Sequence, residues 1–272
     1  MRTRLISIPT DTFPLDGVMY EPGSKVLGSA LYFHGNTMNF YTGAARFLPE
    51  AMCALGLVFV AFNRRGHDIL STRASRQAVG GAYQTVAESV ADNAFAATWM
   101  KEQGYANPII LGHSYGGMLS TQHVVDHPAT PALILLSAGR GGIAQDTTGG
   151  TEKLFAMDRL EELTIQAKEL VAKGRGEDLM MMPGWWYITS ATSFLDRLAH
   201  VPDTIALAPK ITCPVLAIRG DLEDVHRYPA EEFQAACGQH CHVEIIPHCD
   251  HFYNQREDAV IQVVGDWLKK YI

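Results

Sequence analysis

Short apolar runs recur along the chain, separated by longer stretches in which apolar and polar positions mix. The run at residues 57–62, Leu-Val-Phe-Val-Ala-Phe, is apolar at every position. A continuous run of this length is typical of a strand in a parallel sheet that is covered on both faces. Runs of this kind and turn signals between them predict strands at residues 4–8, 17–21, 27–33, 57–62, 109–111, 133–136, 213–219 and 242–246.

The stretches between these runs favour helices. Residues 43–55, for example, are apolar at the spacing of one helix face, at Ala44, Phe47, Leu48 and Ala51. Helices are predicted at residues 43–55, 86–103, 118–127, 153–173, 190–198, 230–237 and 259–271. Strands that alternate with helices predict an α/β fold with a doubly wound, mostly parallel sheet. The carboxyl ends of its strands should line the ligand crevice.

The alternation stops near residue 139. Glycine-rich loops and helical stretches follow, and no strong strand signal returns until Val215. We therefore predict that residues 139–209 form a helical cap insert, while residues 1–138 and 210–272 form the core domain.

Composition narrows the possible partners. The 272-residue chain has a net charge of −7, which argues against a nucleic-acid or anionic-membrane partner. No apolar run reaches about 18 residues, so no membrane span is predicted. Five cysteines, without a signal-peptide pattern, suggest a cytoplasmic protein with free thiols. The oligomeric state, monomer or homodimer, stays open.

One motif carries the candidate chemistry. Residues 112–116 read Gly-His-Ser-Tyr-Gly, between a predicted strand and a predicted helix. A G-x-S-x-G turn in that context holds a serine on a strained bend with its hydroxyl exposed. The alternative is a glycine-rich turn with an incidental serine. The strand and helix favour Ser114 as a nucleophile.

A serine nucleophile needs a base, and the base needs a carboxylate that orients it. His251 follows the last predicted strand and is the candidate base. Three carboxylates, Asp221, Glu223 and Asp224, follow the strand before it. The resulting order, serine, acid and histidine, is the order expected for this architecture.

With these motifs the chain resembles the α/β-hydrolase-fold serine hydrolases that carry a helical cap. The resemblance implies that Ser114 is the nucleophile and that His251 is the base. It also implies that the backbone N–H groups of Tyr115 and Asn36 form the oxyanion hole, since His34-Gly35-Asn36 resembles the family's oxyanion loop.

The acid position departs from the family pattern. The family usually carries an aspartate where this chain has Glu223, and some members carry it at the position of Asp224. Glutamate can replace aspartate in this role. The acid therefore stays open between Glu223 and Asp224, with Asp221 a weaker candidate.

The expected reaction is hydrolysis of a carboxylic ester, or a related acyl bond, through an acyl-enzyme intermediate and without a cofactor. The substrate would be a small to medium, partly apolar molecule, because Trp185 and Trp186 could form the ceiling of its pocket. The same tryptophans could equally be ordinary cap core. Alternatives are a carbon–carbon bond hydrolase or lactonase, and a slow-turnover ligand receptor on the same scaffold.

Three further groups of residues have both a structural and a functional interpretation. Arg64 and Arg65 could contact a substrate carboxylate, although such a pair more often braces its loop. His34 and His113 adjoin glycines, which favours structural hydrogen bonds. Cysteines and histidines are dense over residues 237–251, as in some zinc sites, but their spacing matches no paired ligand motif, and we predict no metal.

Overall fold

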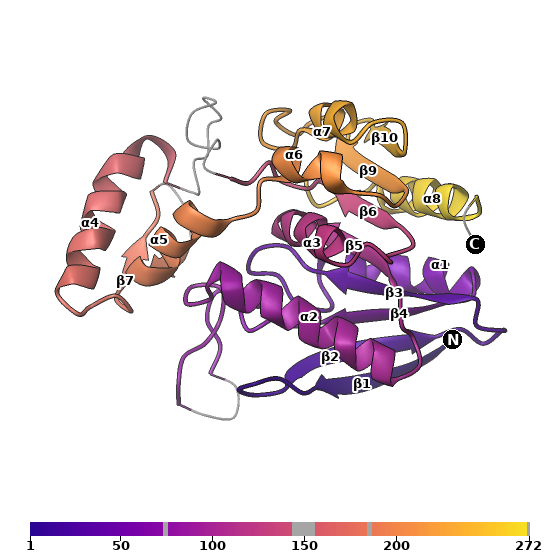
Figure 1. The fold of residues 1–272 in the computed structure, drawn as a ribbon, viewed down its shortest axis with the longest axis horizontal. Helices are drawn as coiled ribbons and strands as arrows, with labels where there is room; N and C mark the ends of the chain where they lie inside the picture. The colour runs from indigo at the N-terminus through magenta and orange to yellow at the C-terminus, as the bar shows by residue number, and fades with distance from the viewer. Residues whose placement is uncertain (73–75, 143–155, 184–186, 271–272) are drawn as a thin grey trace.

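The structure is a computed structural model, and it describes residues 1–72, 76–142, 156–183 and 187–270. Within these residues the chain folds into one large sheet with helices on both faces, and a smaller lobe stands beside it (Figure 1). The N- and C-termini lie at the end of the molecule opposite the lobe.

The large sheet has eight strands among the described residues, in the order β1-β2-β4-β3-β5-β6-β9-β10. All neighbours from β4 to β10 in this order pair in parallel, whereas β2 is antiparallel to both β1 and β4. The strands are β1 (Arg2–Ile8), β2 (Leu15–Glu21), β3 (Gly28–Phe33), β4 (Leu57–Phe62), β5 (Ile109–His113), β6 (Leu133–Leu136), β9 (Val215–Gly220) and β10 (Cys241–Ile246). The predicted fold class is thereby confirmed.

Helices cover both faces of this sheet. The α-helices assigned in the described residues, with the two helices of the lobe included, are α1 (Leu48–Ala54), α2 (Val86–Glu102), α3 (Tyr115–Asp126), α4 (Leu160–Ala172), α5 (Ala191–His200), α6 (Thr204–Leu207), α7 (Ala230–Cys237) and α8 (Glu257–Leu268). One apolar cluster joins α2, α3 and α7 to one face, and a second joins α1 and α8 to the other. Burial on both faces explains why β4 and β6 are apolar at every position.

Two predicted helices begin later than the sequence pattern suggests. The stretch predicted as a helix at residues 43–55 is a short 3-10 turn, Gly43–Arg46, followed by α1, which has Pro49 in its first turn. Proline has no N–H to donate, so it favours a new helix start there. Helix α4 begins at Leu160, and residues 153–155 of the predicted 153–173 helix lie outside the described residues.

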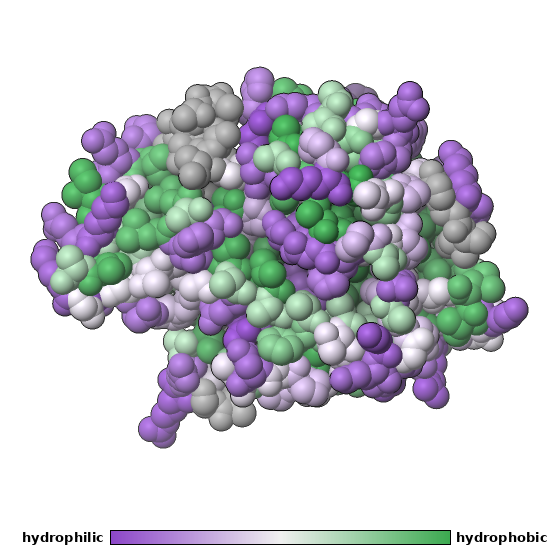
Figure 2. All heavy atoms as spheres, in the orientation of Figure 1, coloured by the Kyte–Doolittle hydropathy of each residue, from purple (hydrophilic) through white to green (hydrophobic). Residues whose placement is uncertain are grey.

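The lobe contains α4, α5 and a two-stranded antiparallel hairpin, β7 (Leu179–Met181) and β8 (Ile188–Ser190). The sequence pattern did not predict this hairpin, because three-residue strands give almost no periodic signal. The lobe has its own apolar cluster, which includes Leu163, Tyr187 and Phe194. Apolar side chains also gather on its outer surface (Figure 2), among them the exposed Ile165 and Met181.

Further along the chain, α6 and the 3-10 turn Ala208–Lys210 pack against α3 and α7 of the sheet layer. The segment that returns from the lobe therefore lies on the core. In the described ranges, no helix is both long enough and apolar enough to cross a membrane.

Candidate active site

Ser114 lies at the bend between β5 and α3. Its backbone has φ 54° and ψ −119°, a conformation that costs free energy for any residue other than glycine and is found at functional sites. The two glycines of the motif let the chain close on itself. A Cβ at Gly112 would lie 2.4 Å from the carbonyl oxygen of Gly116, and one at Gly116 would lie 2.1 Å from that of Phe33.

The Ser114 side chain is available for chemistry. The residue is only partly buried, and its hydroxyl has no hydrogen-bond partner among the described residues. Helix α3 begins at the next residue, so the positive end of its dipole faces any negative charge that develops at the serine.

The loop after β3 lies directly against this serine. A Cβ added to Gly35 would reach van der Waals contact with the Ser114 Cβ at 3.4 Å, and it would crowd His113 Nδ1 at 3.0 Å and Met38 Sδ at 2.7 Å. The next residue in the loop is Asn36. In the described part of the chain, neither the Asn36 N–H nor the Tyr115 N–H donates to an acceptor. The two candidate oxyanion donors are thus on the two segments that meet at Ser114.

His251 is paired with Glu223. The distance from His251 Nδ1 to Glu223 Oε1 is 2.6 Å, and the Glu223 side chain is only 2% exposed. Because a carboxylate can only accept, Nδ1 carries the proton and Nε2 keeps the lone pair that a general base uses. This pairing fixes both the ring orientation and the tautomer of His251.

Of the carboxylates that the sequence left open, the structure brings Glu223 alone to the imidazole. The exposed Asp224 accepts hydrogen bonds from the backbone N–H groups of His226 and Arg227, so it caps the loop after β9. Asp221 accepts from the Cys249 N–H, and backbone hydrogen bonds lower the pKa of its carboxyl. It ties the loop after β9 to the loop after β10.

A buried polar chain holds the other oxygen of Glu223. Oε2 accepts from the Gly220 N–H at 2.7 Å and from the Ser137 hydroxyl at 2.6 Å. The Tyr253 hydroxyl lies 2.6 Å from the same serine oxygen. Since Ser137 gives its one proton to the carboxylate, Tyr253 must be the donor to Ser137. Burial raises the pKa of Tyr253 well above its ordinary value, so its hydroxyl keeps the proton to donate.

Two rings hold the imidazole of His251. Tyr228 stacks on it with ring centroids 4.5 Å apart, and His113 lies at 4.7 Å. His113 Nε2 also donates to the backbone carbonyl of His251 at 2.9 Å. Burial lowers the pKa of His113 to about 3, which keeps this histidine neutral and able to accept on its other nitrogen. His113 therefore has a structural hydrogen bond to the loop of the candidate base.

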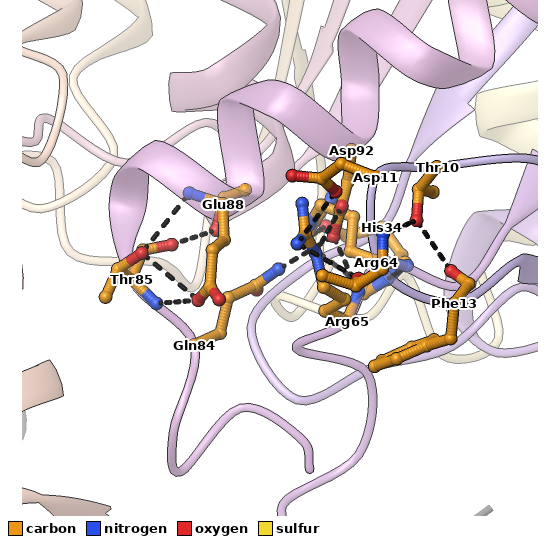
Figure 3. Close-up of polar contacts among 12 residues, drawn as sticks. Thr10, Asp11, Phe13, His34, Arg64, Arg65, Gln84, Thr85, Glu88 and Asp92 are labelled. Atoms are coloured by element: carbon orange, nitrogen blue, oxygen red, sulfur yellow. Dashed lines mark hydrogen bonds and ion pairs between the residues drawn. The ribbon is translucent and has the colours of Figure 1, made fainter.

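His34 braces the loop after β4. Its Nε2 accepts from the Arg64 N–H at 3.1 Å, and its Nδ1 donates to the Gly35 carbonyl at 2.8 Å. Burial lowers the pKa of His34 well below its ordinary value. Arg64 lies next to His34 and is 1% exposed (Figure 3), and its Nη2 donates to the His34 carbonyl at 2.6 Å.

Arg65 has a different environment from its neighbour. Its Nε donates to Asp92 Oδ1 and its backbone N–H to Asp92 Oδ2, both at 2.7 Å (Figure 3). Gln84 donates to the same carboxylate. Burial raises the pKa of Asp92 to about 6, and Arg65 opposes that rise. The pair fastens the loop after β4 to helix α2, the bracing role that the sequence suggested for such an arginine.

Other candidates from the sequence lie elsewhere. Trp185 and Trp186 fall outside the described residues, so the predicted pocket ceiling stays a prediction. All five cysteines are free thiols. Cys237 Sγ lies 3.3 Å from His240 Nε2. Across the described ranges, no three histidine, cysteine or acidic side chains are grouped so that they could hold a metal ion.

Three neighbours of the candidate triad were missed at the sequence level. Ser137 directly follows the buried strand β6, and Tyr253 is two residues after His251, so their positions at strand ends could have suggested both. Tyr228 has no such signal. It reaches His251 from the loop before α7, and only the path of that loop determines the contact.

Comparison with known proteins gives the same fold. A family model described as "Alpha/beta hydrolase family" matches residues 30–263. No curated protein sequence matches the chain. The solved structure of Est1E from Butyrivibrio proteoclasticus with bound ferulic acid has a TM-score of 0.70 at 16% identity, with 98% of each chain covered.

Two further structures are similar over the whole chain. A thermostable carboxyl esterase from Bacillus coagulans has a TM-score of 0.71 at 15% identity, covering 100% of this chain and 99% of its own. The α/β hydrolase GrgF from Penicillium sp. sh18 has a TM-score of 0.73 at 12% identity, with the same coverage. At these identities the likeness concerns the fold.

Proposed function

Because the chain belongs to the α/β hydrolase family, we propose that it is a serine hydrolase that cleaves a carboxylic ester or a related acyl bond. The substrate is a small to medium, partly apolar molecule, and the reaction passes through an acyl-enzyme intermediate. The observation that carries the proposal is the strained Ser114 at the start of α3, at the same sheet edge as the paired His251 and Glu223.

In this mechanism the Ser114 hydroxyl attacks the carbonyl carbon while His251 Nε2 takes its proton. The N–H groups of Tyr115 and Asn36 stabilise the tetrahedral oxyanion, each by about 3 kcal/mol in comparable sites. His251 then protonates the leaving group, and a water molecule, activated by the same nitrogen, releases the acid. Glu223 holds the imidazole and stabilises its charged form. No step needs a cofactor.

Two similar structures support ester hydrolysis as the reaction class. The Bacillus coagulans protein is a carboxyl esterase by name, and Est1E is solved with ferulic acid, a carboxylic acid, bound. Since these proteins share at most 16% identity with this chain, their substrates are not transferred.

Ser114→Ala tests the proposal directly. The variant should lose at least about 10⁴-fold in kcat on p-nitrophenyl acetate, since a triad nucleophile supplies that much or more. A fluorophosphonate probe should label Ser114 in the wild-type protein. Ser7→Ala, which changes an exposed serine on β1, is the matched control and should keep both rate and labelling. Labelling of another residue, or undiminished turnover in Ser114→Ala, would refute the assignment.

A further inference from the structure

Two buried arginines lie close to the ring of Tyr115, the residue after the candidate nucleophile. The Arg64 guanidinium carbon lies 5.6 Å from the ring centroid, and that of Arg197 lies 5.3 Å from it. Arg64 comes from the loop after β4, whereas Arg197 comes from α5 in the lobe. They are 1% and 8% exposed. The core and the lobe thus each contribute one cation at this position, and we call these two residues the arginine pair.

The arginine pair has more donors than partners. Arg64 donates to the His34 carbonyl, and Arg197 donates to the Gly81 carbonyl at 3.2 Å. The remaining Nε and Nη1 of Arg64 and the Nε of Arg197 are buried without a hydrogen-bond partner among the described residues. Asp92, a buried carboxylate nearby, is bonded to Arg65 and Gln84 instead. In the described ranges no carboxylate forms an ion pair with either member of the pair, although the charge of Asp92 favours the charged form of Arg64 from a greater distance.

Besides the aromatic rings beside them, the guanidinium groups would gain hydrogen bonds and a counter-charge from an anion. A buried charge is normally paired, and a buried donor is normally bonded. Burial lowers the pKa of Arg64 to about 10, so the side chain still carries its charge at neutral pH. A guanidinium presents planar donors at the spacing of carboxylate oxygens. Two such groups around one ring suit a carboxylate better than a neutral amide or alcohol.

The position of the arginine pair connects it to the reaction. The Arg64 Nη2 lies 3.4 Å from the Gly35 carbonyl oxygen, which belongs to the peptide group that ends in the Asn36 N–H. Tyr115 supplies the other candidate oxyanion donor, and both guanidinium carbons lie within 5.6 Å of its ring centroid. An anion held here would lie beside both segments that supply the candidate oxyanion donors, so one molecule could carry both this anion and a carbonyl at Ser114.

We propose that Arg64 and Arg197 form a subsite for a carboxylate carried by the ester substrate, so that the enzyme prefers a half-ester or another acid-bearing ester. This inference rests on the proposed serine hydrolase function for its reacting bond. The competing interpretation is that Arg64 only braces the oxyanion loop and that Arg197 only anchors the lobe.

The wild-type protein gives the first test, with pairs of esters that differ only in charge. The acyl series compares p-nitrophenyl hydrogen glutarate with p-nitrophenyl glutaramate. The alcohol series compares 4-acetoxybutanoate with 4-acetoxybutanamide. The carboxylate should be preferred by at least about tenfold in kcat/KM in one series, after subtraction of uncatalysed hydrolysis, as expected for a hydrogen-bonded charge pair. Equal rates within both series would overturn the subsite.

Variants then assign the preference to the arginine pair. Arg197→Met should reduce the ratio of the charged to the neutral ester to about one, and Arg197→Lys, which keeps the charge, should retain part of it. Arg175→Met, which removes an exposed arginine of the same lobe, is the matched control and should keep the wild-type ratio. A preference that survives in Arg197→Met would contradict the assignment.

A binding measurement separates this inference from the proposed function. Calorimetry on Ser114→Ala compares glutarate with glutaramide, and glutarate should bind at least about tenfold more tightly. Failure of the catalytic proposal would appear as ester turnover that persists in Ser114→Ala while glutarate still binds. Failure of the subsite would appear as normal loss of turnover in that variant, with no preference for glutarate over the amide.

Discussion

Two polar regions lie beside the segments that form the candidate active site, and they differ in how completely their hydrogen bonds are made. On the Glu223 side, both carboxylate oxygens are bonded, and the chain continues through Ser137 to Tyr253. On the side of the arginine pair, three buried donors have no partner in the described part of the chain. A fully bonded buried network fixes one geometry, whereas open buried donors are suited to receive a ligand. We therefore expect the Glu223 region to position the catalytic base and the arginine pair to recognise a ligand.

The largest loss of activity is expected when the Glu223 carboxylate, in the fully hydrogen-bonded region, is replaced. Glu223→Gln should lower kcat on p-nitrophenyl acetate by about 10⁴-fold, because an amide cannot hold the required tautomer of His251. Asp224→Asn is the matched control, since this residue caps a loop at the surface, and it should stay within about threefold. If Asp224→Asn lost as much as Glu223→Gln, the bonded network would not be what orients the base.

The sequence predicted the large sheet because its strands are buried on both faces, as at β4, where every residue is apolar. It predicted Ser114 from the G-x-S-x-G turn after a predicted strand, and His251 from its position after the last predicted strand. It left the acid open because Glu223 and Asp224 share one loop, and the choice depends on which of them turns inward to accept from the Gly220 N–H. That turn is a property of the folded loop, and neighbouring residues in a sequence do not reveal it.

The lobe was less predictable for a related reason. Helix α5 was predicted, but which of its faces meets the core depends on how the lobe is placed. Arg197 therefore carried no signal, although it donates to the Gly81 carbonyl and faces Tyr115. Arg64 and Arg65 are adjacent and chemically identical in the sequence, and only the position of Asp92 distinguishes them.

The next largest effect is the difference in unfolding free energy between variants of these two arginines. Arg65→Met leaves Asp92, which is fully buried, without its cation, and should lower the free energy of unfolding by about 3–5 kcal/mol. Arg64→Met removes a cation that has no carboxylate partner, and should cost only about 1 kcal/mol, for its hydrogen bond to the His34 carbonyl. Urea unfolding at pH 7 measures both. Equal losses would mean that Arg64 is structural, and the contrast between the two regions would fail.

A third measurement tests how the stability of the fold changes at low pH. Burial lowers the pKa of His123 to about 3, and an unfolded histidine titrates near 6.5. Between these values the unfolded chain binds more protons, so stability is full above pH 6.5 and falls as the pH drops. His34 and His113, which lie around the oxyanion loop, shift in the same direction.

Each such histidine lowers the free energy of unfolding by up to about 1.4 kcal/mol for each pH unit below 6.5. His123→Phe places a ring beside Phe33 without a titrating group, so its unfolding free energy should fall less steeply between pH 6 and pH 4. The wild-type protein measured in parallel is the reference. An unchanged slope would show that His123 is protonated, or exposed, in the folded protein.

The smallest expected effect tests whether the bonded side acts as a chain. Tyr253 does not touch His251 through a hydrogen bond but donates to Ser137, which donates to Glu223. Tyr253→Phe should lower kcat by about fivefold to tenfold with little change in KM, because it removes one hydrogen bond to a group that positions the acid.

Ser137→Ala removes the direct hydrogen bond to Glu223 and should lower kcat somewhat more. Because Tyr253 acts through Ser137, the double variant should be no slower than Ser137→Ala alone. Additive losses in kcat would mean that Tyr253 reaches the reaction by another route, and its hydroxyl would then belong to the packing of this edge rather than to the network that holds the carboxylate.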